Sequence, residues 1–126
     1  MLEKFLRRIW NRRQDNQRLT LHVPVRTVDP DGNTHEVISE DVSFSGVRLR
    51  FEKIGLAMVL GHREEVPLEI CLDHDGDAVL AQAQLVWAYN TAQGGSVSGW
   101  RFVRFEGNSR ARLQHFLEHY GADSLN

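Results

Sequence analysis

The feature that most constrains the fold is a series of short segments in which apolar and polar residues alternate. Turn-forming stretches such as Asp29–Asn33 separate neighbouring segments. No segment has the spacing of a βαβ unit, in which a helix connects parallel strands. The sequence therefore predicts an all-β, antiparallel barrel or sandwich. The six expected strands span residues 19–28, 34–41, 47–52, 66–72, 78–89 and 97–105.

Helical patterns are expected at both ends of this series. Apolar residues at helical spacing, with basic residues between them, predict a short amphipathic basic helix or arm over residues 1–12. Its apolar face could dock on the protein's own strands, on a membrane surface or on a partner protein. A second helix is expected over residues 109–120, ending at Gly121. Residues 13–126 are then one domain, in which residues 53–64 form a loop or a single helical turn.

Composition places the chain among ordinary globular proteins. Its 126 residues are 41% hydrophobic and 25% charged, which suits one domain with a real core. No apolar run approaches the length of a membrane span, so stable membrane insertion is not expected. The start of the chain lacks the continuous apolar stretch of a signal peptide. The single cysteine, Cys71, excludes an internal disulfide and favours a reducing compartment, so we expect a cytoplasmic protein.

The charge is unevenly distributed along the chain. Residues 1–18 contain six basic and two acidic side chains, a net charge of +4, so the remainder carries −6 of the total of −2. A basic segment on an acidic body suits an anionic ligand or the acidic face of a partner. A nucleic-acid polymer is not an expected partner, because its binding surfaces are usually basic over a wide area. The acidic body likewise argues against a small barrel that binds single-stranded nucleic acid.

A motif with binding chemistry begins at the last residue of the second expected strand. Asp41, Ser43 and Gly46 form the pattern Asp-x-Ser-x-x-Gly. Asp and Ser side chains accept hydrogen bonds from nearby backbone amides, and glycine lets the backbone lie close to a ligand. The Asp41 carboxylate can also accept the N–H groups of a guanine's Watson–Crick edge. Arginines in residues 12–18 can bond to guanine O6 and N7 or hold phosphate, so together the two segments predict a guanine-nucleotide site.

The order and spacing of these residues resemble the PilZ domain, the bacterial receptor module for cyclic di-GMP. That family carries Arg-x-x-x-Arg, then a short strand, then Asp/Asn-x-Ser-x-x-Gly. Arg18 stands where the second arginine of the first motif belongs, and Asp41, Ser43 and Gly46 match the second motif in full. Because the pieces occur in order, the resemblance is more specific than either motif alone.

The resemblance extends over roughly residues 12–120. Residues 85–87 (Leu-Val-Trp) resemble the family's strand that ends in Trp, and residues 98–102 resemble its Gly-x-x-Phe strand. The resemblance implies a six-stranded antiparallel β-barrel with a short N-terminal helix and a C-terminal helix packed on the barrel. Taken by residue type, Trp87 is expected to be a core or rim aromatic, whereas the resemblance places it near a guanine face.

One position departs from the family pattern. Counting back from Arg18, the first arginine of Arg-x-x-x-Arg belongs at position 14, where the chain has Gln14. Glutamine keeps two N–H donors but has no charge, and the difference between a charged and a neutral hydrogen bond predicts a loss on the order of tenfold in affinity. Arg13 or Arg12 could compensate if the segment shifts by a residue, whereas Asp15 would repel a phosphate.

The function implied by the resemblance is a cyclic di-GMP-binding signalling receptor or adaptor without catalysis, cofactor or metal. Binding would draw the arginine-bearing segment onto the barrel, and the changed surface would act on an unidentified partner protein in motility or biofilm signalling. The alternative, favoured by Gln14, is a degenerate domain that binds no nucleotide and serves as a protein–protein adaptor. The predicted ligand-binding residues are Arg12, Arg13, Gln14, Arg18, Asp41, Ser43, Gly46 and Trp87.

Other patterns along the chain are less specific. Residues 115–119 match His-x-x-Glu-His, which places two imidazoles one helical turn apart. A zinc site would need a third ligand further downstream, where seven residues follow, so we expect His115 and His119 to be solvated. The acidic turn at residues 73–77 lacks the spacing of an EF-hand loop. No base is spaced to activate Cys71, so a catalytic role for it is not expected.

Overall fold

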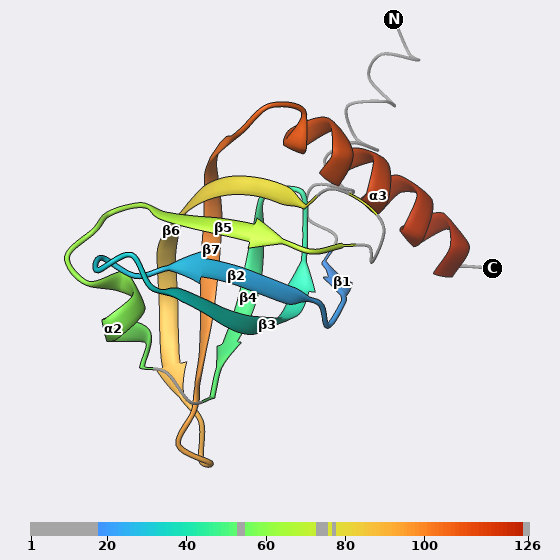
Figure 1. Cartoon of the computed structure of the whole chain (residues 1–126). Coiled ribbons are helices and arrows are strands. Elements are labelled where there is room, and N and C mark those ends of the chain that lie inside the picture. Colours follow the sequence, from blue (N-terminus) through green and yellow to red (C-terminus); the bar gives the residue numbers. More distant parts are fainter. Residues whose placement is uncertain (1–17, 53–54, 73–75, 77, 125–126) are drawn as a thin grey trace, which may run out of the picture.

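In the computed structural model, which describes residues 18–52, 55–72, 76 and 78–124, six strands close an antiparallel β-barrel and a seventh lies outside it (Figure 1). The strands are β1 (Leu19–Thr20), β2 (Pro24–Val28), β3 (Thr34–Val42), β4 (Gly46–Phe51), β5 (Val66–Ile70), β6 (Val79–Asn90) and β7 (Ser96–Phe105). Their order around the barrel is β3-β2-β5-β6-β7-β4, and pairing of β4 with β3 closes it. The expected antiparallel barrel is confirmed. The helix or arm expected over residues 1–12 lies outside the described residues.

The first expected strand, over residues 19–28, is interrupted in the structure. Residues 21–23 separate β1 from β2, so the prediction of one continuous strand is wrong there. Ser39 of β3 bridges the interruption, because its hydroxyl accepts the Val23 amide at 2.9 Å and donates to the Leu21 carbonyl. A buried side chain thus replaces part of the backbone ladder. The other strand boundaries differ from the expected ones by one or two residues.

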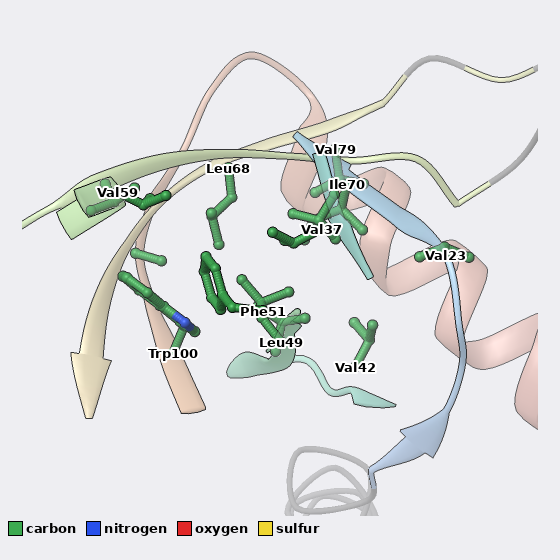
Figure 2. Packing of buried hydrophobic residues seen from close by; sticks show 14 of the residues in the cluster. Val23, Val37, Val42, Leu49, Phe51, Val59, Leu68, Ile70, Val79 and Trp100 are labelled. Atoms are coloured by element: carbon green, nitrogen blue, oxygen red, sulfur yellow. The ribbon is translucent and has the colours of Figure 1, made fainter. Parts of the chain in front are cut away.

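Apolar side chains from all six barrel strands fill the interior (Figure 2). Leu49, Phe51 and Ile70 are among the largest fully buried side chains. Each such burial contributes roughly 1.5–3 kcal/mol to folding. Trp100 also lies in this core, where its indole N–H donates to the Ser98 hydroxyl at 2.8 Å. Stability therefore comes mainly from the barrel interior.

Two helices lie outside the barrel: α2 (Leu56–Leu60) and α3 (Ser109–Ser124). The first is the single turn expected within residues 53–64, and the second extends four residues beyond the expected end at residue 120. The Ser109 hydroxyl accepts the Leu80 amide at 2.9 Å, which ties the start of α3 to β6. Leu113 inserts from α3 into the core. Neither described helix is long and apolar enough to cross a membrane.

The turn expected at Asp29–Asn33 is confirmed. The Asp29 carboxylate accepts the amides of Asp31 and Asn33, both at 2.9 Å, and contacts the His35 ring at 2.7 Å. The His35 contact, followed by the Asn33 amide, lowers the pKa of Asp29 to about 2. Gly32 takes a φ of 90°, which a side chain would oppose.

Candidate functional site

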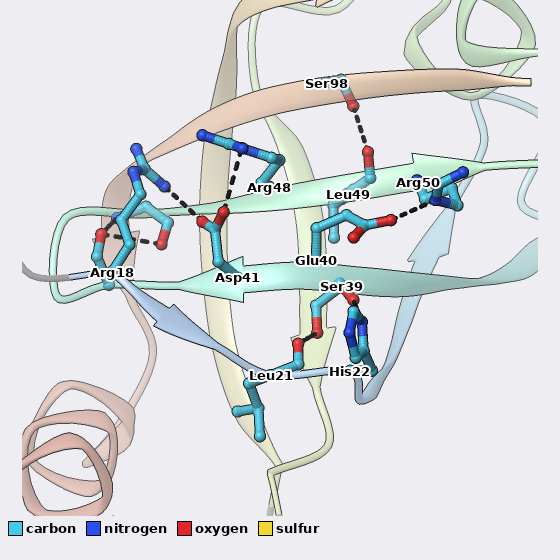
Figure 3. Close-up of polar contacts among 12 residues, drawn as sticks. Arg18, Leu21, His22, Ser39, Glu40, Asp41, Arg48, Leu49, Arg50 and Ser98 are labelled. Carbon is cyan, nitrogen blue, oxygen red and sulfur yellow. Dashed lines mark hydrogen bonds and ion pairs between the residues drawn. The ribbon is translucent and has the colours of Figure 1, made fainter. Parts of the chain in front are cut away.

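A β-bulge in β3 places two acidic side chains on the outer face of the barrel. The pairing of β3 with β4 shifts between Ser39 and Asp41, so Glu40 is an extra residue in β3. Ser39 points inward and is fully buried, whereas Glu40 and Asp41 form ion pairs with Arg50 and Arg48 of β4 (Figure 3). Strict alternation would have turned Asp41 to the same face as Ser39. The bulge therefore turns the motif aspartate to the outer face of the barrel.

Both oxygens of the Asp41 carboxylate face an arginine. Arg18, just before β1, donates from Nη1 to Oδ1 at 2.8 Å, and Nε of Arg48 lies 3.2 Å from Oδ2 (Figure 3). The Arg48 Nε–H is nevertheless not aligned for a hydrogen bond, and this buried atom has no such partner among the described residues. The Asp41 side chain is 11% exposed, against 42% for Arg18 and 38% for Arg48. The result is a nearly buried carboxylate between two partly exposed cations.

A second bulge, in β6, brings Trp87 to this outer face. The pairing of β6 with β7 shifts between Leu85 and Trp87. Leu85 packs against the core, and Trp87 lies over the backbone of Gly99, where a Cβ atom would be only 2.3 Å from the indole nitrogen. Alternation along the sequence places Trp87 on the same face as Leu85, and that prediction is wrong because it does not count the bulge residue, Val86.

The Trp87 ring places an aromatic surface next to the charged cluster of Arg18, Asp41 and Arg48. The Arg48 guanidinium carbon lies 5.3 Å from the centre of the ring, a cation–π contact. Tyr89 stacks on Trp87 with ring centres 5.7 Å apart and planes inclined by 9°. Because Tyr89 is 57% exposed, the stack is open to solvent. One outer surface thus offers a carboxylate, two guanidinium groups and stacked aromatic rings.

Ser43 and Gly46 form the turn beneath this surface. The Ser43 hydroxyl accepts the Gly46 amide at 3.1 Å, and the Ser43 amide donates to the Gly46 carbonyl at 2.8 Å. Gly46 is not at positive φ, but a Cβ there would lie 2.2 Å from the Trp100 carbonyl oxygen. Both residues are buried. They therefore have a structural reason to be serine and glycine that needs no ligand.

The turn also contacts α3. The guanidinium of Arg110 lies over the Phe44 ring, 5.3 Å from its centre. Phe44 is one of the two residues between Ser43 and Gly46. A rearrangement of the motif turn would therefore change the contact between Phe44 and Arg110 at the start of α3.

The structure brings together part of the predicted set. Arg18 and Asp41 are in direct contact, and Trp87 joins them through Arg48. Arg12, Arg13 and Gln14 lie outside the described residues. Sequence reasoning missed Arg48 because the pattern marks it only as a polar residue on an alternating strand. Its pairing with Asp41 depends on the strand register, which alternation alone does not give.

No group of three or more possible metal ligands occurs within the described ranges. His115 and His119 are exposed on α3 and lie against each other, with ring centres 3.9 Å apart. The Nδ1 atom of His119 is 2.8 Å from the His115 carbonyl oxygen. These contacts are local to one exposed helix face.

Comparisons with known proteins agree with this architecture. A family model described as PilZ domain matches residues 11–119. The PilZ domain of YcgR from Escherichia coli, solved with c-di-GMP, has a TM-score of 0.65 and 15% identity over 86% of this chain and 91% of that one. No curated protein sequence matches the chain.

Two longer proteins share the fold. The Bacillus subtilis inhibitor of motility MotI/DgrA has a TM-score of 0.65 and 12% identity over 84% of this chain. The MrkH–c-di-GMP complex of K. pneumonia has a TM-score of 0.65 and 15% identity over 86% of it. The matched region covers only 49% and 52% of those two chains, about half of each. At these identities the likeness concerns the fold alone.

Proposed function

The chain belongs to the PilZ domain family, and from this membership we propose that it is a receptor for cyclic di-GMP that catalyses no reaction. The single observation that carries the proposal is the Asp41 carboxylate, which a bulge turns to the outer face between Arg18 and Arg48, with Trp87 against Arg48. A carboxylate suits the donors on a guanine's Watson–Crick edge. Arginines suit guanine acceptors and phosphate oxygens, and the half-buried indole of Trp87 suits stacking on a base.

The free state would have to open for the ligand. Arg18 holds Oδ1 of Asp41 at 2.8 Å, in the place that a guanine donor would take. A guanine that displaces Arg18 frees its guanidinium for a ligand phosphate, so one broken ion pair is replaced by two charge-assisted contacts. The ligand can shift this equilibrium only by its higher affinity for the open arrangement.

The signal would then pass to a partner protein. Arg18 is the last residue of the basic segment, residues 1–18, so its movement would reposition the rest of that segment. On the other side, the contact of Phe44 with Arg110 joins the motif turn to α3. The partner would bind a surface formed by these parts, and the solved structures of YcgR and MrkH with c-di-GMP provide a precedent for the ligand.

Calorimetric titration with cyclic di-GMP tests the proposal. We expect binding by the natural chain and a loss of at least about tenfold in affinity in both Arg18→Ala and Asp41→Ala, since each variant removes a charged hydrogen-bonding group. Both residues lie outside the core, so the melting temperatures should stay close to that of the natural chain. Normal binding by either variant would place the site elsewhere.

The alternative function is a protein–protein adaptor that binds no nucleotide. Gln14 favours it, because it removes one charge from the family's arginine pair. The occupied Asp41 carboxylate is also compatible with a permanently closed site. In that case the natural chain would give no heat with cyclic di-GMP while remaining fully folded.

A further inference from the structure

Arg48 has a donor that no acceptor among the described residues matches with a hydrogen bond. Its Nε atom is buried, and no hydrogen-bond acceptor among the described residues is aligned with it, although Asp41 Oδ2 is 3.2 Å away. Buried polar groups are nearly always hydrogen-bonded, and an exception calls for an explanation. Arg50 is a useful contrast, since two residues along the same strand face its Nε is hydrogen-bonded to Glu40.

The surroundings of Arg48 indicate which ligand group it suits. On one side lies the Asp41 carboxylate, and on the other the Trp87 ring at 5.3 Å. A guanine stacked on Trp87 with its N1–H and N2–H groups toward Asp41 would carry O6 on the adjoining edge, next to N7. Arginine is the side chain that bonds bidentately to O6 and N7. A carboxylate and a guanidinium lying side by side are therefore complementary to two edges of one guanine.

We propose that Arg48 recognises guanine through O6 and N7, while Asp41 accepts the Watson–Crick edge of the same base. This inference rests on the proposed cyclic di-GMP function and adds a specificity-determining residue outside both family motifs. A rotation of the guanidinium from Asp41 toward the base matches its donors with ligand acceptors. Arg48 then supplies a cationic group at a site where the Arg-x-x-x-Arg motif lacks its first arginine, because position 14 is Gln14.

The test uses Arg48→Gln and the matched control Arg50→Gln in the full chain. Both arginines lie on the outer face of β4, both side chains are 38% exposed, and both face an acidic residue of the β3 bulge. Only Arg48 contacts Trp87. We expect Arg48→Gln to bind cyclic di-GMP on the order of tenfold more weakly or worse, and Arg50→Gln to bind within about twofold of the natural chain.

A ligand analogue separates base recognition from a structural role. Cyclic di-GMP with 7-deazaguanine bases lacks N7 but keeps the phosphates, O6 and the Watson–Crick edge. The natural chain and Arg50→Gln should bind the analogue more weakly than cyclic di-GMP, whereas Arg48→Gln should bind both ligands equally. Such non-additivity is the signature of a direct contact between the altered groups.

Three outcomes decide the matter. The pattern above supports the proposal. If the natural chain binds but Arg48→Gln binds as tightly, or loses the same factor for both ligands, Arg48 does not recognise N7 and the inference is overturned while the receptor function stands. If the natural chain binds neither ligand, the proposed receptor function is wrong, and the role proposed for Arg48 is wrong as well.

Discussion

Asp41 lies in the site because β3 contains one residue more than its partner strand. The sequence predicts a binding role for this carboxylate, since it follows a strand and an arginine segment precedes that strand, and the structure brings it into contact with Arg18. Its contact with Arg48 could not be predicted, because the pairing of the two residues depends on the bulge at Glu40. The alternation of apolar residues shows which residues face the core. It does not show the pairing register between two strands or where a bulge adds a residue.

For Ser43 and Gly46, the structure shows a role in the fold that the motif alone does not indicate. Motif matching singles them out as ligand contacts, and the structure gives both a local role in the turn. The turn-forming role of Ser43 is evident from the sequence. The need for glycine at position 46 is not evident from the sequence. It arises because the Trp100 carbonyl, on a strand more than fifty residues further along the chain, leaves no room for a Cβ atom. Long-range packing of this kind has no local sequence signal.

Gln14 offers a prediction at the level of one side chain. Gln14→Arg restores the family's Arg-x-x-x-Arg spacing with Arg18 and adds a charged fork. If residue 14 contacts the ligand, cyclic di-GMP should bind roughly tenfold more tightly, the difference between a charged and a neutral hydrogen bond. Calorimetric titration of the natural chain and the variant measures the change.

Arg13→Ala is the companion variant for this measurement. If Arg13 already replaces the missing arginine through a shift of the segment, Arg13→Ala should be damaging and Gln14→Arg should change little. A Gln14→Arg protein that gives neither heat nor a thermal shift would exclude the receptor function and leave the adaptor.

At the level of elements, strands were predictable and irregularities were not. The alternation of apolar residues identifies all six barrel strands, because burial of one face imposes a period of two. The break between β1 and β2 and the bulges in β3 and β6 leave no such signal. Two of these irregularities turn Asp41 and Trp87 to the same outer face. The departures from regular strands are thus what assemble the site.

Gly99→Ala tests whether the position of Trp87 matters for binding. A Cβ at this residue would lie 2.3 Å from the indole nitrogen, so the ring must move off β7, which disturbs its contact with Arg48. We expect a red-shifted tryptophan emission and an affinity for cyclic di-GMP several-fold lower, since stacking on an aromatic ring is worth about 1–3 kcal/mol per base.

The control for this variant is Gly55→Ala. A Cβ at Gly55 would have no atom of the described residues within 4 Å, and its φ of −66° suits alanine, so the substitution introduces no strain. Its emission spectrum and affinity should match those of the natural chain. If Gly99→Ala also binds normally despite the spectral shift, Trp87 is not part of the ligand surface.

For the whole molecule, the core and the site are separate in both position and chemistry. The barrel interior is apolar, whereas the site lies on its outer face and is built largely from charges. Substitutions at the site should therefore alter binding far more than folding. The same separation lets binding energy be measured through stability, because a ligand that binds only the folded state raises the melting temperature.

The last prediction concerns salt. At a free ligand concentration of about 100 times Kd, binding adds about 2.7 kcal/mol to the free energy of unfolding, which corresponds to a melting-temperature increase of roughly 10 °C for a domain of this size. Contacts from arginines are screened as salt rises from about 0.05 M to about 0.5 M. If affinity falls about tenfold over that range, the same ligand concentration should give only about half the increase.

Melting curves with and without cyclic di-GMP at each salt concentration measure this effect. The unliganded curves remove any influence of salt on the fold itself. Asp41→Ala should show little or no ligand-induced increase at either concentration, because it lacks the carboxylate that we propose accepts the guanine's Watson–Crick edge. An increase of equal size at low and high salt would mean that uncharged contacts dominate binding. The arginines around Asp41 would then serve mainly to hold the barrel surface together.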